Sequence, residues 1–282
     1  MRFFDRLSNG WKLGKTSLKT IQENPTLLWF PIISTISLVI VTISFFGSGY
    51  LFFGEQILGI ADDETSLTSL NIVLYLLAFL FYLINYFVII FFNIGLVHCA
   101  KNALNGEEVS LSEGIRYAQS RAGTILAWSF LAATVGIILK TLQERLGAVG
   151  GIITGIIGMV WGIATFFVVP VLAYEDVTPI EAVKRSASIM KEKWGESIGA
   201  NFSFGLFTLI GILFIAIPAG FLTGFLMHPI IGVMTGFALL MMVFVVTSAA
   251  DMVFMAAIYQ YVNNEPIGNF EGDILDDVFV QK

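Results

Sequence analysis

The chain has 282 residues, of which 56% are hydrophobic and only 13% are charged, and its mean hydropathy is +0.83. Soluble domains usually carry about twice that share of charged residues, so these values exclude an ordinary water-soluble protein. The net charge of -6 excludes general nucleic-acid binding, because phosphate contacts require clustered lysines and arginines. With Cys99 as the single cysteine, neither an intrachain disulfide nor a multi-cysteine metal cluster can form.

Long stretches without Asp, Glu, Lys or Arg divide the chain into membrane spans, because a charge at the bilayer centre costs several kcal/mol. About 20 apolar residues cross a bilayer as a helix, so the uncharged stretch 197–250 must fold back on itself near His228. The sequence therefore predicts an all-α polytopic membrane bundle in one domain, 1–262, followed by a tail. The six expected spans are about 28–53, 70–98, 122–139, 148–174, 198–226 and 229–262.

The basic residues predict the orientation of these spans. All but two of the 15 lysines and arginines fall on one side, and Lys140 and Arg145 fall on the other. Short loops rich in Lys and Arg stay in the cytoplasm. Both termini are therefore predicted to be cytoplasmic.

A basic amphipathic helix is predicted before spans 1, 3 and 5. In segment 2–21, apolar residues recur every three or four positions and lysines occupy the remaining surface, which is typical of a helix at an anionic lipid surface. The later two segments begin at Ser110 and Thr178, each followed three residues on by Glu, as in a capping box. The chain thus forms a loose threefold repeat of interfacial helix and transmembrane hairpin. Lipid binding is predicted for Lys12, Lys15, Lys19, Lys184 and Arg185.

The segment 263–282 is predicted to be an acidic cytoplasmic tail, with five carboxylates before Lys282. Two roles stay open for it. It is either a solvated tail or a segment that docks on the basic helices or on a protein partner.

Asp251 is the strongest candidate for a functional polar residue, because no other acid lies between Glu196 and Glu265. Acids inside a membrane often serve ions, protons or substrates. A span that begins at Pro229 reaches the interface about 22 residues later, so a structural acid at the boundary is the competing interpretation. Other polar residues of the spans would either line a cavity with Asp251 or hydrogen-bond helices together. They are Asn85, Asn93, Asn201 and Ser248.

Span 4 carries a strip of glycines, which lets another helix approach closely. The neighbour is either a helix of the same chain or a second protomer, so a homo-oligomer stays open. Four further glycines predict close packing between the outer ends of spans 5 and 6. The strip consists of Gly147, Gly151, Gly155, Gly158 and Gly162, and the further set of Gly220, Gly224, Gly232 and Gly236.

Several segments together resemble a bacterial and archaeal six-helix membrane family of unknown function, over nearly the whole chain. They include Ser8–Lys12, Phe92–Asn93, Ala164–Val171, Lys193–Glu196 and Tyr259 with Tyr261. More distantly, the repeat is similar to the membrane domain of some glycerophosphodiester phosphodiesterases. The resemblance implies a location in the plasma membrane of a prokaryote, and it supplies no catalytic residues.

No hydrolase, nucleotide-binding or metal-binding motif occurs in the sequence, so neither a cofactor nor a metal is expected. His98 and Cys99 are adjacent, but they lack the further ligands or paired base that a site requires. Two hypotheses follow. The first is a non-enzymatic membrane module that engages inner-leaflet lipid, a protein partner or both. The alternative is a transporter or channel for a small molecule, ion or lipid, with a polar cavity near Asp251.

Overall fold

The computed structural model describes residues 14–59, 64–192, 205, 207–265 and 267. Within these ranges the chain is helical with short connections and contains no strand, which confirms the predicted all-α class. Six segments are long and apolar enough to cross a membrane, as expected of a multi-pass membrane protein. They are Pro25–Ser48, Tyr75–Leu104, Ala122–Leu146, Gly150–Tyr174, Phe207–Leu226 and Pro229–Val262.

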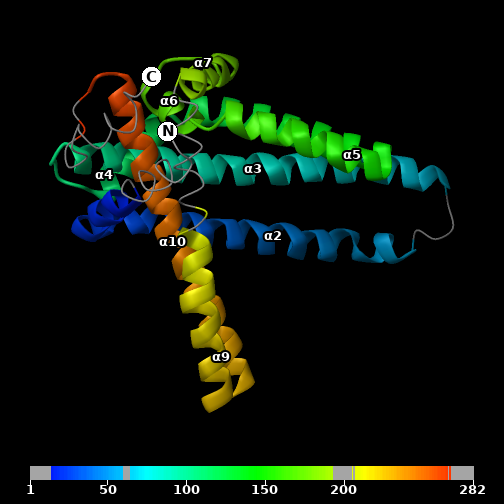
Figure 1. The fold of residues 1–282 in the computed structure, drawn as a ribbon. Helices are drawn as coiled ribbons and strands as arrows, with labels where there is room; N and C mark the ends of the chain where they lie inside the picture. Colours follow the sequence, from blue (N-terminus) through cyan, green and yellow to red (C-terminus); the bar gives the residue numbers. More distant parts are fainter. Residues whose placement is uncertain (1–13, 60–63, 193–204, 206, 266, 268–282) are drawn as a thin grey trace.

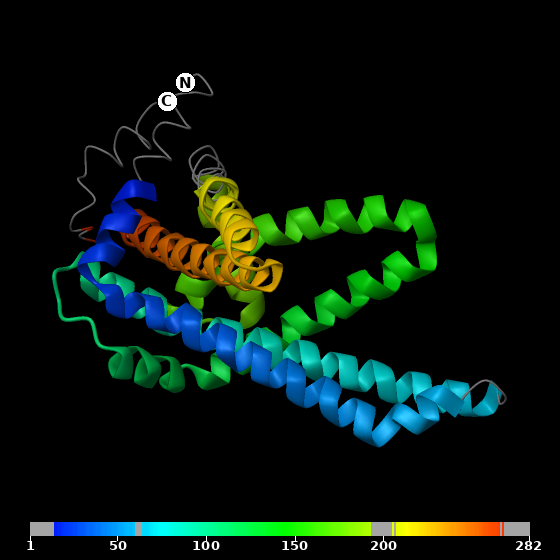
Figure 2. The same cartoon turned by 90° about the horizontal axis from the view of Figure 1, so that it is seen from below.

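The first hairpin consists of α2 (Trp29–Gly59) and α3 (Glu64–Leu104), which lie side by side (Figures 1 and 2). It is preceded by a short helix over 14–23 and by the 3-10 turn η1 (Pro25–Leu28). Proline fits the first turn of a helix because its missing N–H has no partner there. Asn24 has non-helical dihedral angles, so the short helix ends there and a new helical segment begins at Pro25.

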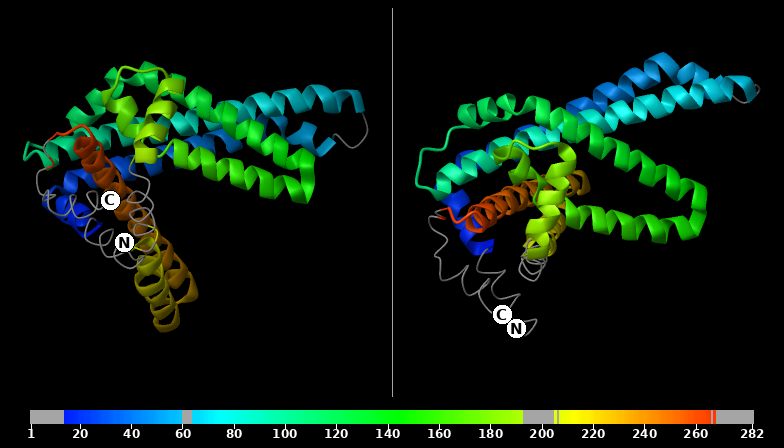
Figure 3. Two further views of the ribbon diagram at one scale, coloured as in Figure 1. Left: turned by 45° about the horizontal axis from the view of Figure 1, so that its top comes forward. Right: turned by 90° about the horizontal axis from the view of Figure 1, so that it is seen from above.

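The second hairpin is formed by α5 (Ala122–Ala164), which contains two spans and folds back sharply on itself (Figures 2 and 3). A Cβ on Gly150 would lie 2.7 Å from Cβ of Leu146 and 2.9 Å from the carbonyl oxygen of Gln143, so only glycine fits this bend. The loop expected after residue 139 is helical instead. Its Lys, Leu, Gln, Glu and Arg residues are strong helix formers, and Lys140 pairs with Glu144 at 4.0 Å.

The third hairpin joins α9 (Ile217–Leu226) to α10 (Pro229–Val262) at the predicted turn. His228 caps α10, because its Nδ1 accepts a hydrogen bond from the backbone N–H of Ile230 at 3.3 Å. A Cβ on Gly232 would lie 2.5 Å from Cα of Gly224. The predicted close glycine packing between these two helices is confirmed.

The three short helices that precede the hairpins gather at one end of the molecule (Figure 1). They are the helix over 14–23, α4 (Leu111–Ser120) and α7 (Pro179–Glu192), and α6 (Val168–Tyr174) lies among them. This arrangement is the one that the predicted repeat of short helix and hairpin requires. We call this end the base; it also includes 90–104 of α3 and 249–262 of α10.

The hydrophobic core lies in the base. Ile94, Leu172, Phe254 and Ile258 are fully buried there. The outer parts of the hairpins, which we call the arms, expose their side chains; Phe225 is 79% exposed. The α9–α10 arm runs in a different direction from the other two (Figures 1 and 3). The six helices thus meet at one end and diverge at the other.

Candidate functional site

The helix over 14–23 has one buried and one exposed face. Ser17, Thr20 and Ile21 are buried in the protein, whereas Lys15 and Lys19 are exposed. A Cβ at position 14 would collide with the ring of Phe207, so glycine permits the helix to sit directly on that ring. One face of this helix thus packs on the protein, and its lysines point outward; the amphipathic helix predicted over 2–21 stays a prediction.

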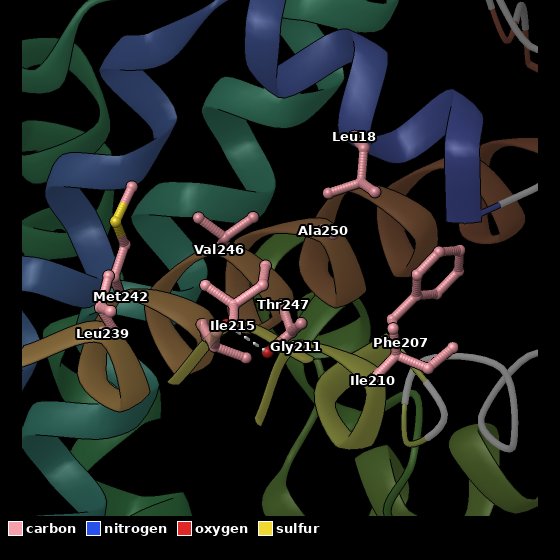
Figure 4. Close-up of a pocket in the computed structure, with 11 residues that line it drawn as sticks. Leu18, Phe207, Ile210, Gly211, Ile215, Leu239, Met242, Val246, Thr247 and Ala250 are labelled. Atoms are coloured by element: carbon pink, nitrogen blue, oxygen red, sulfur yellow. Dashed lines mark hydrogen bonds between the residues drawn. The ribbon is translucent and has the colours of Figure 1, made fainter. Parts of the chain in front are cut away.

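An apolar cavity of about 490 Å³ lies between this helix, residues 207–215 and α10 (Figure 4). Among the residues that line it are Leu18, Phe207, Ile215 and Val246. Among the described lining residues, Thr247 is the one with a polar side chain, and its hydroxyl already donates to the carbonyl oxygen of Val243 at 2.8 Å. The described lining of the cavity therefore offers contacts mainly to an apolar group.

One wall of the cavity is built from an irregular helix. Residues 207–211 are helical and continue into a π-helical segment, η3 (Ile212–Ala216), before α9 begins. A Cβ on Gly211 would lie 2.8 Å from Cγ1 of Val243, so glycine brings this wall close to α10. π-Helical turns are rare and often occur at functional sites. Close approach at Gly211 and the wider turn after it together shape the cavity.

The described members of the predicted polar set do not line this cavity. The amide of Asn85 donates to the carbonyl oxygen of Phe81, 2.7 Å away on its own helix. Asn93 is partly buried on α3, Ser248 is exposed on α10, and Asn201 lies outside the described residues. A shared polar cavity around them stays a prediction.

Asp251 follows Ala250, which does line the cavity. Its Oδ1 is buried and has no hydrogen-bond partner among the residues that the structure describes. A buried carboxylate oxygen without a partner is costly in an apolar environment. Among the described members of the predicted polar set, Asp251 is therefore the one with a buried oxygen that lacks a hydrogen-bond partner.

The residues predicted to bind the lipid surface differ in their surroundings. Lys15, Lys19 and Lys184 are exposed, and Lys19 lies 3.8 Å from Glu23. Lys12 lies outside the described residues. Arg185 is partly buried, and its role at a lipid surface stays a prediction. Its Nε donates to Glu175 at 2.9 Å and its Nη2 to Asn263 at 3.3 Å, so its guanidinium joins helices of the base.

A polar and aromatic network in the base was not found from the sequence. The hydroxyl of Tyr174 donates to the carbonyl oxygen of Val97 at 3.1 Å, and its ring stacks on Tyr259 with centroids 5.4 Å apart. Nζ of Lys101 lies 4.7 Å from the centre of the Tyr174 ring and 2.5 Å from Oε2 of Glu265. This network joins α3, α6, α10 and the segment after α10.

His98 and Cys99 are part of the packing of α4 on α3. Nε2 of His98 lies 3.2 Å from Oε1 of Glu113, and its ring stacks on Tyr117. Sγ of Cys99 donates to the carbonyl oxygen of Ser110 at 3.3 Å. No group of three metal-ligating side chains occurs among the described residues. These contacts give both residues a structural role.

Only one of the two predicted capping boxes forms. The backbone N–H of Thr178 donates to Glu181 at 2.8 Å, and the N–H of Glu181 donates back to the Thr178 hydroxyl at 3.4 Å. These bonds hold the pKa of the Glu181 carboxyl below its usual value, the backbone bond first and the hydroxyl bond second. Ser110 makes no such side-chain bond, because Glu113 turns to His98 instead.

Four glycines of the span 4 strip face open space at their Cβ positions among the described residues. A Cβ added at Gly151, Gly155, Gly158 or Gly162 would meet nothing within 4 Å. The surroundings of Gly147 lie outside the description. Packing of this strip on a helix of the same chain or of a second protomer stays a prediction.

The fold defines a multi-pass helical membrane protein with a compact base. Residues 72–269 match a family of unknown function, DUF6159, and the chain belongs to this family. The resemblance to a membrane family of unknown function is thereby confirmed at that level. No curated protein matches the chain. The more distant similarity to glycerophosphodiester phosphodiesterases has no support from these comparisons.

Proposed function

We propose that the protein is a non-enzymatic membrane module that binds anionic lipid at the cytoplasmic leaflet. The observation that carries this proposal is the docked helix over 14–23, which fixes Lys15 and Lys19 on its outer face. Lys184, on the short helix α7, is also exposed at the base. Each lysine near an anionic surface contributes about 1 kcal/mol of attraction.

The proposed orientation of the protein in the membrane follows from the distribution of its charged residues. The base holds the ends of the spans that are flanked by most of the lysines and arginines, which corresponds to a cytoplasmic position. Lys140 lies near the bend of α5, at the other end of its span. It is half of a pair with Glu144, and it serves as a natural control for charge removal.

The test is lipid retention by the full chain, purified from nanodiscs that contain equal amounts of phosphatidylglycerol and phosphatidylcholine and examined by native mass spectrometry. Replacing Lys15, Lys19 and Lys184 by glutamine is expected to lower phosphatidylglycerol retention by about fivefold per lysine. Lys140→Gln is expected to leave retention unchanged. An equal loss in the control, or no loss in the triple variant, would overturn the proposal.

A second candidate function, transport of protons or cations, is favoured by Asp251. Its Oδ1 is buried in a candidate span without a partner among the described residues. In proteoliposomes that contain a pH-sensitive dye and carry a potassium diffusion potential, this candidate predicts proton uptake that Asp251→Asn abolishes. Uptake equal to that of protein-free vesicles would reject proton transport.

A further inference from the structure

We propose that the cavity between the helix over 14–23 and α10 holds one acyl chain of an anionic glycerophospholipid, whose phosphate is bound by Lys15 and Lys19. This inference rests on the proposed function and assigns it a site. The volume of about 490 Å³ falls within the range of small-molecule sites, about 300–1,000 Å³.

The shape and chemistry of the cavity fit a hydrocarbon chain. The lining residues of α10 run from Leu239 to Ala250, which corresponds to about 16 Å along the helix at 1.5 Å per residue. Figure 4 shows Leu239 and Met242 at one end of the cavity and Leu18 and Phe207 at the other. The hydroxyl of Thr247 is already bonded to its own helix, so the described side chains along this length favour an apolar ligand.

The position of the cavity makes a membrane lipid the natural occupant. Its walls belong mainly to Phe207–Leu226 and Pro229–Val262, two segments that are long and apolar enough to cross a membrane. The α9–α10 arm diverges from the α2–α3 arm (Figure 1). The end near Phe207 is where span 5 starts, so it is the end near the headgroups.

The lysines at the edge of the cavity indicate which class of lipid headgroup would bind there. Leu18 borders the cavity at that end, and Lys15 and Lys19 lie three residues before and one residue after it on the same short helix. Both lysines are exposed. Glu23 is the acid on this helix, and it lies 3.8 Å from Lys19 with both side chains largely in solvent. The cationic edge therefore favours a lipid with net negative charge over a zwitterionic one.

The experiment uses phosphatidylglycerol with a photoreactive diazirine in its acyl chain, added to nanodiscs that contain the full chain. After illumination, labelled peptides are mapped by mass spectrometry. In the wild type, labelling is expected in 207–215 and 239–250.

Val246→Trp fills the cavity from α10 and is expected to lower this labelling at least tenfold. The matched control is Val233→Trp, because Val233 is 73% exposed on the same helix and lies outside the cavity. The control should label as the wild type does.

Ile215→Trp, on the opposite wall, repeats the test if Val246→Trp fails to fold. Undiminished labelling in a folded cavity-filling variant would overturn the acyl-chain site. Equal labelling by a phosphatidylcholine probe of the same chain would overturn the anionic headgroup. Failure of the site is distinct from failure of the proposed function. In the first case the lysine variants still lose phosphatidylglycerol while cavity filling has no effect, and in the second the lysine variants lose nothing.

Discussion

The base and the arms of this protein are held together by different interactions. The base joins segments that are far apart in the sequence: Lys101 pairs with Glu265, and Tyr259 donates to Glu175 at 3.0 Å. In the α9–α10 arm, by contrast, the close contacts are between the two helices of the hairpin, as at Gly224 and Gly232. Long-range specificity is thus concentrated in the base.

This difference shows what the membrane supplies and what the protein supplies. Large apolar side chains such as Phe214 and Phe221 are mostly exposed on the arms, so lipid must cover them. In the base, protein covers the apolar side chains, and hydrogen bonds satisfy many of the polar groups. Substitutions in the base are therefore expected to cost more stability than the same substitutions in the arms.

The largest effect is expected from Phe254→Ala. Phe254 is fully buried in the base, and truncation of a buried phenylalanine costs about 3–5 kcal/mol through lost packing and the resulting cavity. Phe237, on the same helix, is 61% exposed in its arm, and Phe237→Ala is expected to cost about 0.5 kcal/mol or less. Denaturant unfolding in detergent micelles measures both. Similar losses would remove the distinction between base and arms.

The next effect concerns two neighbouring carboxylates, Glu175 and Asp176. Glu175 accepts hydrogen bonds from both Arg185 and Tyr259, so Glu175→Gln is expected to cost about 1.5–3 kcal/mol. Asp176 bonds to Arg121 but its side chain is 98% exposed, so Asp176→Asn is expected to cost about 0–1 kcal/mol. The same unfolding measurement compares them, and the reverse order would contradict the proposed role of the network.

Within the arms, glycine identity should matter only where helices meet. A Cβ on Gly232 would lie 2.5 Å from Cα of Gly224, so Gly232→Ala is expected to force α9 and α10 apart at a cost of about 1–3 kcal/mol. Gly155→Ala enters open space and is expected to cost nothing. A marked loss from Gly155→Ala in thermal unfolding would indicate a partner helix on that strip, such as one from a second protomer.

The smallest expected effect is a pH dependence at the start of α7. The bonds from Thr178 lower the pKa of Glu181, so they favour the charged carboxylate in the folded protein. The stabilisation is complete above the usual value of 4.5 and is lost as the pH falls through the lowered value. Amide hydrogen exchange in 179–184, corrected for intrinsic rates, should lose protection in that window. Glu181→Gln should show no such window; the same loss in this variant would contradict the assignment.

Much of the fold could be predicted from the sequence, because uncharged length alone defines a membrane span. The turn at His228 and the glycine contacts of α9 and α10 follow from local patterns of the same kind. The helix continues past residue 139, the expected end of span 3, because the charged residues there favour a helix. The helix propensity of these residues favours a continued helix, whereas their charges keep them out of the bilayer and so indicate the end of a span.

The candidate site was less predictable, because it depends on contacts between distant segments. The sequence shows lysines on the helix over 14–23, but not that Leu18 of that helix borders a cavity with Val246. The partner of Glu113 was missed for the same reason: the local capping pattern competes with His98 on another helix. Arg185 looks from the sequence like an exposed basic residue. In the structure its guanidinium bonds to Glu175 in the base.

The most direct test of this account is a cryo-electron microscopy structure of the full chain in nanodiscs that contain phosphatidylglycerol. The account predicts elongated density for one acyl chain between Leu18 and Met242, with headgroup density beside Lys15 and Lys19. A cavity filled by the protein's own side chains, with the two lysines remote from any headgroup, would contradict it.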